Sequence, residues 1–218
     1  MDHQLAAMVR RHDPDRYLCT LLAPERARDA LFTLYAFDHE LARASQVASQ
    51  PMLALIRLQW WREVVEGAER RHEVATPLSA ALAEGCLDRG ECLRMIEGRE
   101  MEAEGEIADL AAFEHYCLEA HGSTMAAAGL ALGAGDADAL RRVGAGCGAV
   151  WVMQRRKQFL PLEDVTVLAA AWLSTKVQQP RSTAVLPAVL AARDLRQGAH
   201  PRLLWDQLAV LRRAWLGI

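Results

Sequence analysis

The sequence has little that would form a β-sheet. Its 218 residues contain no run in which apolar and polar side chains alternate, and no Asn-Gly dipeptide, which is the strongest short signal for a hairpin. Apolar side chains instead recur at intervals of three and four over most of the chain, as in amphipathic helices. We therefore predict an all-α fold, a single helical bundle that takes in residues 1–218.

Long apolar runs and an excess of positive charge are also lacking. No run of about 18 uncharged apolar residues occurs, so we expect no membrane-spanning helix. The first 15 residues are charged and hold no secretory apolar region, so we expect no signal peptide there. The formal net charge is −3, and nothing in this balance suggests a nucleic-acid partner.

The five cysteines are scattered along the chain, and none forms a Cys-x-x-Cys pair. This pattern fits reduced thiols in a cytoplasmic protein. Charge is unevenly distributed: residues 97–119 are strongly acidic, with Arg99 as their only lysine or arginine, whereas residues 141–157 carry basic side chains and no acid. Solvated helix faces explain this better than two interaction surfaces.

Prolines, glycines and the apolar periodicity predict where the helices begin and end. Pro24 followed by Glu25 is a good helix start, because proline tolerates the first turn and an acid there suits the helix dipole. Gln50-Pro51 ends that helix. After a short segment before Asp13-Pro14, we expect helices over residues 24–49, 52–68, 76–85, 87–106, 110–132, 137–156, 163–177, 184–197 and 203–216.

Four short motifs occur in a fixed order along the first three quarters of the chain. They are Leu34-Tyr35-Ala36-Phe37, the segment RLQWWR at residues 57–62, Tyr116-Cys117 followed by Gly122-Ser123, and RKQFLPLED at residues 156–164. Together they resemble the squalene/phytoene synthase family. The resemblance implies an all-helical isoprenoid-synthase fold, and in active members the joining of two prenyl diphosphates around magnesium ions.

The resemblance fails at the two aspartate-rich motifs that such enzymes use. Magnesium prefers carboxylate oxygens, and two aspartates one helical turn apart hold it against the diphosphate. The first set of positions holds Ala42, Arg43 and Gln46. The second holds Gly148, Trp151 and Arg155, where the resemblance implies glutamine, asparagine and aspartate. We therefore expect no metal ligands, no catalytic residues and no cofactor. Mg²⁺ would be required only if the chain were an active prenyl transferase.

Three further sequence segments resemble one branch of this family, the respiratory complex I assembly factors. They are YLCTLLAP at residues 17–24, Ser49-Gln50 with RLQWW at residues 57–61, and RRKQFLP at residues 155–161. The resemblance implies a non-catalytic assembly factor or chaperone that contacts respiratory complex subunits or assembly intermediates. Such a protein could bind an isoprenoid or lipid, and it could contact the inner membrane peripherally. The alternative is an active prenyl transferase that uses Asp38, Glu40 and the acids of residues 97–106.

Candidate pocket residues come from these motifs and from the altered aspartate positions. For Arg43 and Arg155, ion pairs with Glu40, Glu100 or Glu102 are favoured over ligand binding. Trp205 and Trp215 could meet a membrane or a partner, but closing the bundle is the favoured role. At least one tryptophan of the RLQWW segment is expected in the core. The candidates are Tyr35, His39, Arg43, Arg57, Trp60, Trp61, Tyr116, Gly122, Ser123 and Arg155.

Overall fold

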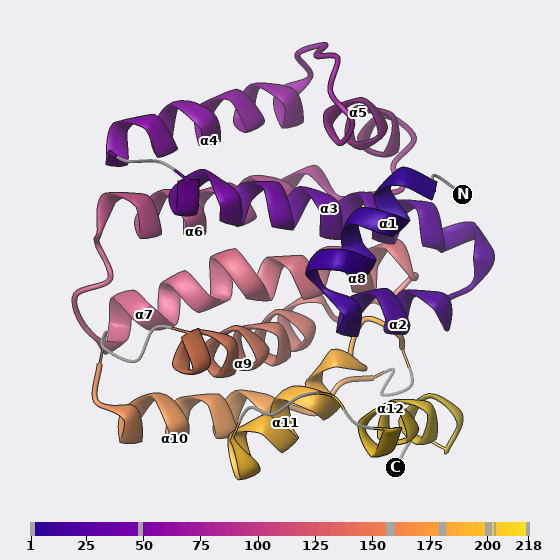
Figure 1. The fold of residues 1–218 in the computed structure, drawn as a ribbon, viewed down its shortest axis with the longest axis vertical. Coiled ribbons are helices and arrows are strands. Elements are labelled where there is room, and N and C mark those ends of the chain that lie inside the picture. The colour runs from indigo at the N-terminus through magenta and orange to yellow at the C-terminus, as the bar shows by residue number, and fades with distance from the viewer. Residues whose placement is uncertain are drawn as a thin grey trace.

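A computed structural model describes residues 3–47, 50–155, 160–178, 182–198, 202 and 204–216. These residues form helices joined by loops, without a strand, which confirms the predicted all-α class (Figure 1). The elements are α1 (His3–His12), α2 (Pro14–Leu21), α3 (Glu25–Val47), α4 (Pro51–Glu66), α5 (Ala75–Ala83), α6 (Arg89–Glu104), α7 (Leu110–Tyr116), the π-helical turn η1 (Cys117–Gly122), α8 (Ser123–Ala131), α9 (Ala137–Arg155), α10 (Leu162–Leu173), α11 (Pro187–Gln197) and α12 (Leu204–Leu216).

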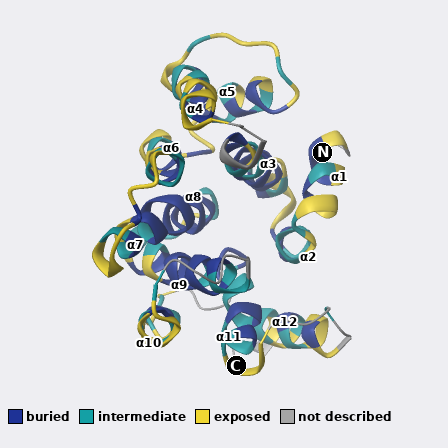
Figure 2. Cartoon of the chain, turned by 60° about the vertical axis from the view of Figure 1, so that its left-hand side comes forward, coloured by how far each residue is buried: buried dark blue, intermediate teal, exposed yellow. Residues whose placement is uncertain are grey.

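The helices stack in successive layers along the longest axis of the molecule (Figure 1). α4 and α5 form one end, and α3 and α6 lie beneath them. The continuous α7–η1–α8 segment packs on α6 from the other side and is followed by α9, which contacts α10 and α11. α1 and α2 pack on α3. The middle helices are therefore covered on several sides, and Figure 2 shows α8 buried along most of its length.

The apolar face of the long α3 helix is the centre of the largest hydrophobic cluster. Leu31, Leu34, Phe37 and Leu41 are each at most 1% exposed, which confirms the face that the spacing predicts. Burying one such side chain contributes about 1.5–3 kcal/mol relative to leaving it in water. This helix therefore fixes the position of the residues on its other faces.

The buried face of α4 differs from the predicted one. The periodicity of Leu55, Ile56, Trp60 and Val64 suggested the inward stripe, but Ile56 is 59% exposed. The inward stripe is Ala54, Leu58, Trp61, Val64 and Val65, so Val64 is the one member of the predicted set that is buried. Both stripes are apolar and helically spaced, so periodicity alone could not choose between them.

A π-helical turn interrupts what we predicted as one helix over residues 110–132. Residues Cys117–Gly122 form η1, and such turns add a residue to an α-helix and bulge its backbone. Small residues let the neighbouring helix approach closely here. A Cβ added to Gly144 of α9 would lie 2.7 Å from the Met125 Cβ and 2.9 Å from the His121 carbonyl oxygen. Close helix packing is therefore what the glycines of this region provide.

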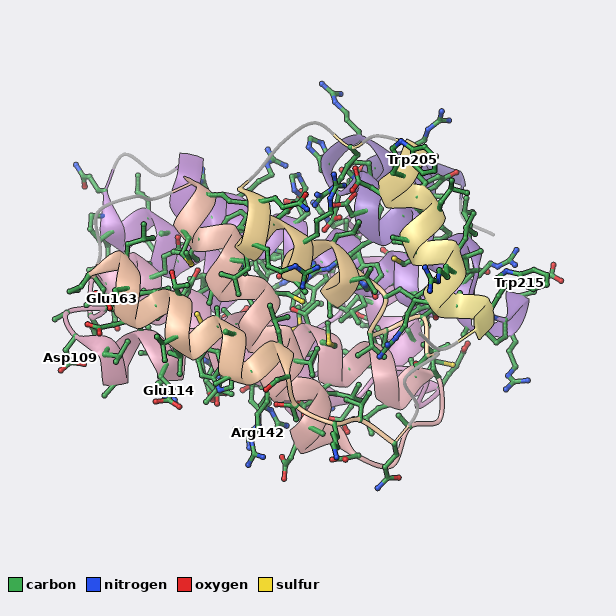
Figure 3. The ribbon with its side chains drawn as sticks, turned by 90° about the horizontal axis from the view of Figure 1, so that it is seen from below. Asp109, Glu114, Arg142, Glu163, Trp205 and Trp215 are labelled. Carbon is green, nitrogen blue, oxygen red and sulfur yellow. The ribbon has the colours of Figure 1, made fainter. Side chains whose placement is uncertain are left out.

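The tryptophans of α12 do not close the bundle, so that interpretation was wrong. Trp205 is 73% exposed and Trp215 is 76% exposed, and both project outward (Figure 3). Asp206 and Val210 face inward instead and are almost fully buried. None of the helices described here is long and apolar enough to span a membrane.

Candidate functional site

A cavity of about 390 Å³ lies at the centre of the bundle. Residues from α1, α2, α3, α6, η1, α8, α9 and α11 line it, so it is built from both halves of the chain. Its wall includes Tyr35 and His39, two of the predicted pocket residues. The His39 ring stacks on His12 of α1, with 4.0 Å between ring centroids. Burial, followed by the nearby His12, lowers the pKa of His39.

Asp38 is a buried carboxylate of this cavity, and two arginines neutralise it. Its Oδ2 accepts a hydrogen bond from Arg16 Nη1 at 2.6 Å, and its Oδ1 accepts one from Arg99 Nη2 at 3.3 Å. Burial alone would raise the pKa of Asp38, but Arg16 and then Arg99 outweigh it and lower the pKa to about 2. The carboxylate is therefore ionised and its charge is already matched.

Arg99 continues this network toward η1. Its Nη1 lies 3.1 Å from Glu102 Oε2 and 3.3 Å from the Tyr116 hydroxyl. That hydroxyl lies 3.3 Å from Nε2 of His121. Burial and then the charge of Arg99 lower the pKa of His121 to about 3, so its imidazole is neutral at physiological pH. The network thus holds ion pairs and a neutral histidine in the interior.

A second hollow of about 330 Å³ lies between α3, α4 and the loop that joins α4 to α5. It holds four other predicted pocket residues, Arg43, Arg57, Trp60 and Trp61. One of the two tryptophans is core, as expected: Trp61 is 4% exposed, whereas Trp60 is half-buried. The remaining lining residues are Glu40, Ala44 and His72.

The sequence model of squalene/phytoene synthase matches residues 9–155, most of the chain. The chain belongs to the squalene/phytoene synthase family. A human relative, NADH dehydrogenase (ubiquinone) complex I assembly factor 6, is 28% identical over 177 residues, which cover 74% of this chain and 53% of the relative. The Drosophila melanogaster homolog of that factor is 38% identical over 61 residues, covering 28% of this chain and 18% of the homolog. This family member thus spans about half the length of the human relative.

Solved structures agree with the family on the fold. A crystal structure of a dehydrosqualene synthase in complex with ligand superposes with a TM-score of 0.76, over 97% of this chain and 94% of that one. The two sequences are only 11% identical, so the likeness shows the fold alone. The predicted isoprenoid-synthase bundle is thereby confirmed.

The positions that correspond to the two aspartate-rich motifs can now be located in this family member. Ala42 of α3 and both Gly148 and Trp151 of α9 line the central cavity. Arg43 turns away from it, is half-exposed, and pairs with Glu40 at 2.8 Å. The favoured ion pair of Arg43 therefore forms, but at the surface. The described residues contain no group of three His, Cys, Asp or Glu side chains that could hold a metal ion.

The remaining candidates lie near the cavity without lining it, or outside the described side chains. Tyr116 acts through the hydrogen-bond network, and Gly122 packs against α9, where an added Cβ would lie 2.5 Å from the Arg141 carbonyl oxygen. Ser123 is fully buried on α8. The side chain of Arg155 lies outside the described residues, so its predicted role stays a prediction.

Sequence reasoning missed three members of this site, Arg16, Arg99 and His121. The signal for Arg99 was present, since a lone arginine within an acidic run is placed to pair with buried carboxylates. Arg16 and His121 gave no comparable signal. Their roles arise because α2 packs on α3 and η1 packs on α6 and α9, which no local spacing predicts.

Proposed function

We propose that this chain is a non-catalytic member of its family that assists the assembly of respiratory complex I. The names of its curated relatives support this role. The observation that carries the proposal is the lining of the central cavity, where Ala42 stands at an aspartate position of the first motif, and Gly148 and Trp151 stand at the glutamine and asparagine positions of the second. Both aspartate-rich motifs are, in this proposal, lost.

The two arginines beside Asp38 oppose metal binding at that carboxylate. The carboxylate of Asp38 is already paired with Arg16 and Arg99. A divalent cation placed beside Asp38 would lie close to both guanidinium groups, and their repulsion would cost several kcal/mol at a semi-buried effective dielectric. Metal-assisted departure of a diphosphate is thereby disfavoured.

The cavity has the size of a ligand pocket, and its lining is partly apolar and partly charged. Its volume of about 390 Å³ falls within the usual range for ligand pockets, about 300–1,000 Å³. Apolar side chains from three helices, among them Met125, Val150 and Leu190, share its wall with the charged network. We therefore propose an isoprenoid or lipid chain as the ligand of this cavity. The proposed partners are complex I subunits or assembly intermediates, and the proposed location is the cytoplasmic side of the inner membrane.

Two measurements test the proposal. Purified protein incubated with farnesyl or geranylgeranyl diphosphate and Mg²⁺ should release no diphosphate, while an active dehydrosqualene synthase serves as the positive control. Deleting the gene in its source organism should lower NADH:ubiquinone oxidoreductase activity and the amount of assembled complex on native gels, and the intact gene should restore both. Diphosphate release, or complex I levels that do not change, would overturn the proposal.

A further inference from the structure

The second hollow opens beside an unusually apolar surface of α4. Three large side chains on the first two turns of this helix face solvent: Met52 is 63% exposed, Leu53 is 43% exposed and Ile56 is 59% exposed. Trp60 follows Ile56 by four residues and lines the hollow itself. We call these four residues, together with Arg43 and Arg57, the α4 surface. Figure 2 shows α4 at the outer edge of the bundle with its outward side exposed.

The aromatic wall of the hollow is held in place from behind. Trp60 meets Trp61 edge to face, with 4.9 Å between centroids and 85° between planes. Trp61 in turn packs against Phe37 of the core at 5.3 Å. The His72 ring contacts both tryptophans, at 5.7 and 5.4 Å. The wall is therefore rigid, and a ligand that packs on it loses little energy in ordering it.

His72 also presents a defined donor. Its Nδ1 accepts hydrogen bonds from the backbone N–H groups of Val74 and Ala75, at 3.1 and 3.4 Å. An accepting Nδ1 carries no proton, so the neutral ring carries its proton on Nε2. Nε2 has no hydrogen-bond partner within the described part of the chain. The ring can therefore donate one hydrogen bond to a ligand.

Two arginines give the hollow its charge. Arg57 is exposed and forms no ion pair with the residues that the structure describes. Arg43 uses one Nη1–H bond to Glu40, and a guanidinium has five N–H donors in all. Guanidinium groups bind carboxylates through paired hydrogen bonds, and they do so more strongly beside apolar walls than in open water.

We propose that the α4 surface docks an acidic segment of a partner protein. An aspartate or glutamate carboxylate of that segment binds Arg43 and Arg57, and an adjacent apolar side chain packs on Trp60 and Ile56. A cluster of exposed apolar side chains beside a concave site is typical of protein interfaces. The inference rests on the proposed assembly role, for which it supplies the contact site.

A membrane surface fits this site less well than a protein segment does. The same face of α4 carries Glu63, seven residues after Ile56, and Glu40 lines the hollow. Each is paired with an arginine, Glu63 with Arg70 at 2.9 Å and Glu40 with Arg43 at 2.8 Å, so their charges do not distinguish an acidic protein segment from an anionic lipid surface. The hollow, however, is concave, whereas a helix that lies on a bilayer presents a convex apolar face.

A library of random twelve-residue peptides displayed on phage tests the proposal on the full chain. We expect the enriched peptides to carry Asp or Glu next to apolar residues. Their synthetic copies should bind the Arg57→Gln or Ile56→Ser variant about tenfold more weakly, which is the loss of one charge-assisted contact or one buried apolar side chain. The changed residues are exposed, so the variants should unfold at the same temperature as the parent chain.

Matched controls come from the far side of the molecule. Arg142→Gln alters an exposed arginine of α9, and Val167→Ser alters a 65% exposed valine of α10; neither should change peptide binding (Figure 3). Enriched peptides without acids, or peptides that bind the Arg57 variant as tightly as the parent, would overturn the proposal. The proposal would also be overturned if the protein bound phosphatidylglycerol vesicles and Arg57→Gln abolished that binding, because the α4 surface would then bind lipid.

The docking site and the proposed function can fail separately. A gene carrying Arg57→Gln and Ile56→Ser, returned to the deletion strain, should restore complex I less well than the intact gene does. Full restoration by this variant would overturn the docking site while leaving the assembly role in place. If even the intact gene changes nothing in complex I, the assembly role fails, and the peptide measurements then decide the docking site alone.

Discussion

The guanidinium of Arg99 and the carboxylate of Asp38 meet inside the bundle, with 3.3 Å between Nη2 and Oδ1, although 61 residues separate them in sequence. Arg16 approaches the other carboxylate oxygen at 2.6 Å. One carboxylate therefore joins α2, α3 and α6 at the cavity. In a low-dielectric interior, such an arrangement is stable only while all three charges are present.

Replacing Asp38 by asparagine should destabilise the protein strongly. The change removes the carboxylate that Arg16 and Arg99 share and leaves Arg16 with Asp13, at 3.5 Å, and Arg99 with Glu102, at 3.1 Å. Breaking a buried pair in this way costs about 3–5 kcal/mol. The free energy of unfolding in urea measures it. Glu40→Gln is the matched control, because its partner Arg43 is half-exposed, and the loss there should stay below about 1 kcal/mol. Equal losses in the two variants would show that the interior pair is not structural.

His121 should make the protein less stable as the pH falls below about 6. Burial, then Arg99, holds its folded pKa at about 3, against 6.5 for an unperturbed histidine, so between these values only the unfolded chain binds the proton. Stability is therefore complete above about pH 6.5. It is lost on acidification by about 1.4 kcal/mol per pH unit from this group until the pH reaches about 3.

Urea unfolding at pH 7, 6 and 5 measures this dependence, and His121→Gln is the control because glutamine does not titrate. The variant should show a slope smaller by about 1.4 kcal/mol per pH unit below pH 6. Asp38 does not interfere in this range, since its depressed pKa of about 2 removes stability only below about pH 4. Parallel curves for both proteins would mean that His121 is protonated in the folded state.

Gly98→Ala should destabilise the contact between α6 and η1. A Cβ at residue 98 would lie 2.4 Å from the backbone nitrogen of Ala120 and 2.8 Å from its Cα, atoms that cannot turn aside. Overpacking lowers the free energy of unfolding by about 3 kcal/mol at the upper end, and the better helix propensity of alanine offsets about 1 kcal/mol of this. We therefore expect the free energy of unfolding to fall by about 2 kcal/mol.

The control for this change is Gly135→Ala, where an added Cβ would meet no atom within 4 Å. Its backbone does not adopt the left-handed conformation that favours glycine, so this substitution should leave the unfolding free energy nearly unchanged. If Gly98→Ala were as mild as the control, α6 and η1 would have room that their backbone positions do not indicate.

Most helices and the bundle could be predicted because apolar periodicity and boundary residues act locally. Gly105, for example, ends α6 in a left-handed conformation, φ 74°, close to the predicted end of that helix. The inward stripe of α4 could not be predicted, because Ile56 and Leu58 are equally apolar and only the neighbouring helices decide which is buried. The π-helical turn also arises from packing rather than from a local signal.

The candidate site was predicted as one pocket, whereas the structure divides its residues between two hollows. Adjacent residues of α3 line different hollows: His39 lines the central cavity, whereas Glu40, together with Arg43, lines the hollow beneath α4. Motif spacing identified His39 and Arg43 but could not reveal this division, because it depends on where α4 and α9 lie around α3. The partners of Asp38 come from distant segments for the same reason.

A single cysteine should react quickly in the folded protein. All five are free, but Cys86 is the exposed one, whereas Cys19, Cys92 and Cys117 are buried and Cys147 is partly so. Burial raises the pKa of Cys92 and of Cys147 to about 12, so neither forms appreciable thiolate at pH 8, and the thiolate is the reactive species.

A chromogenic aromatic disulfide at pH 8 should therefore react rapidly with one equivalent of thiol, and with the other four only in denaturant. Cys86→Ser should remove the rapid phase and Cys147→Ser should keep it, because that thiol stays protonated inside the cavity wall. A rapid phase that survives Cys86→Ser would show that the central cavity opens to reagent in solution.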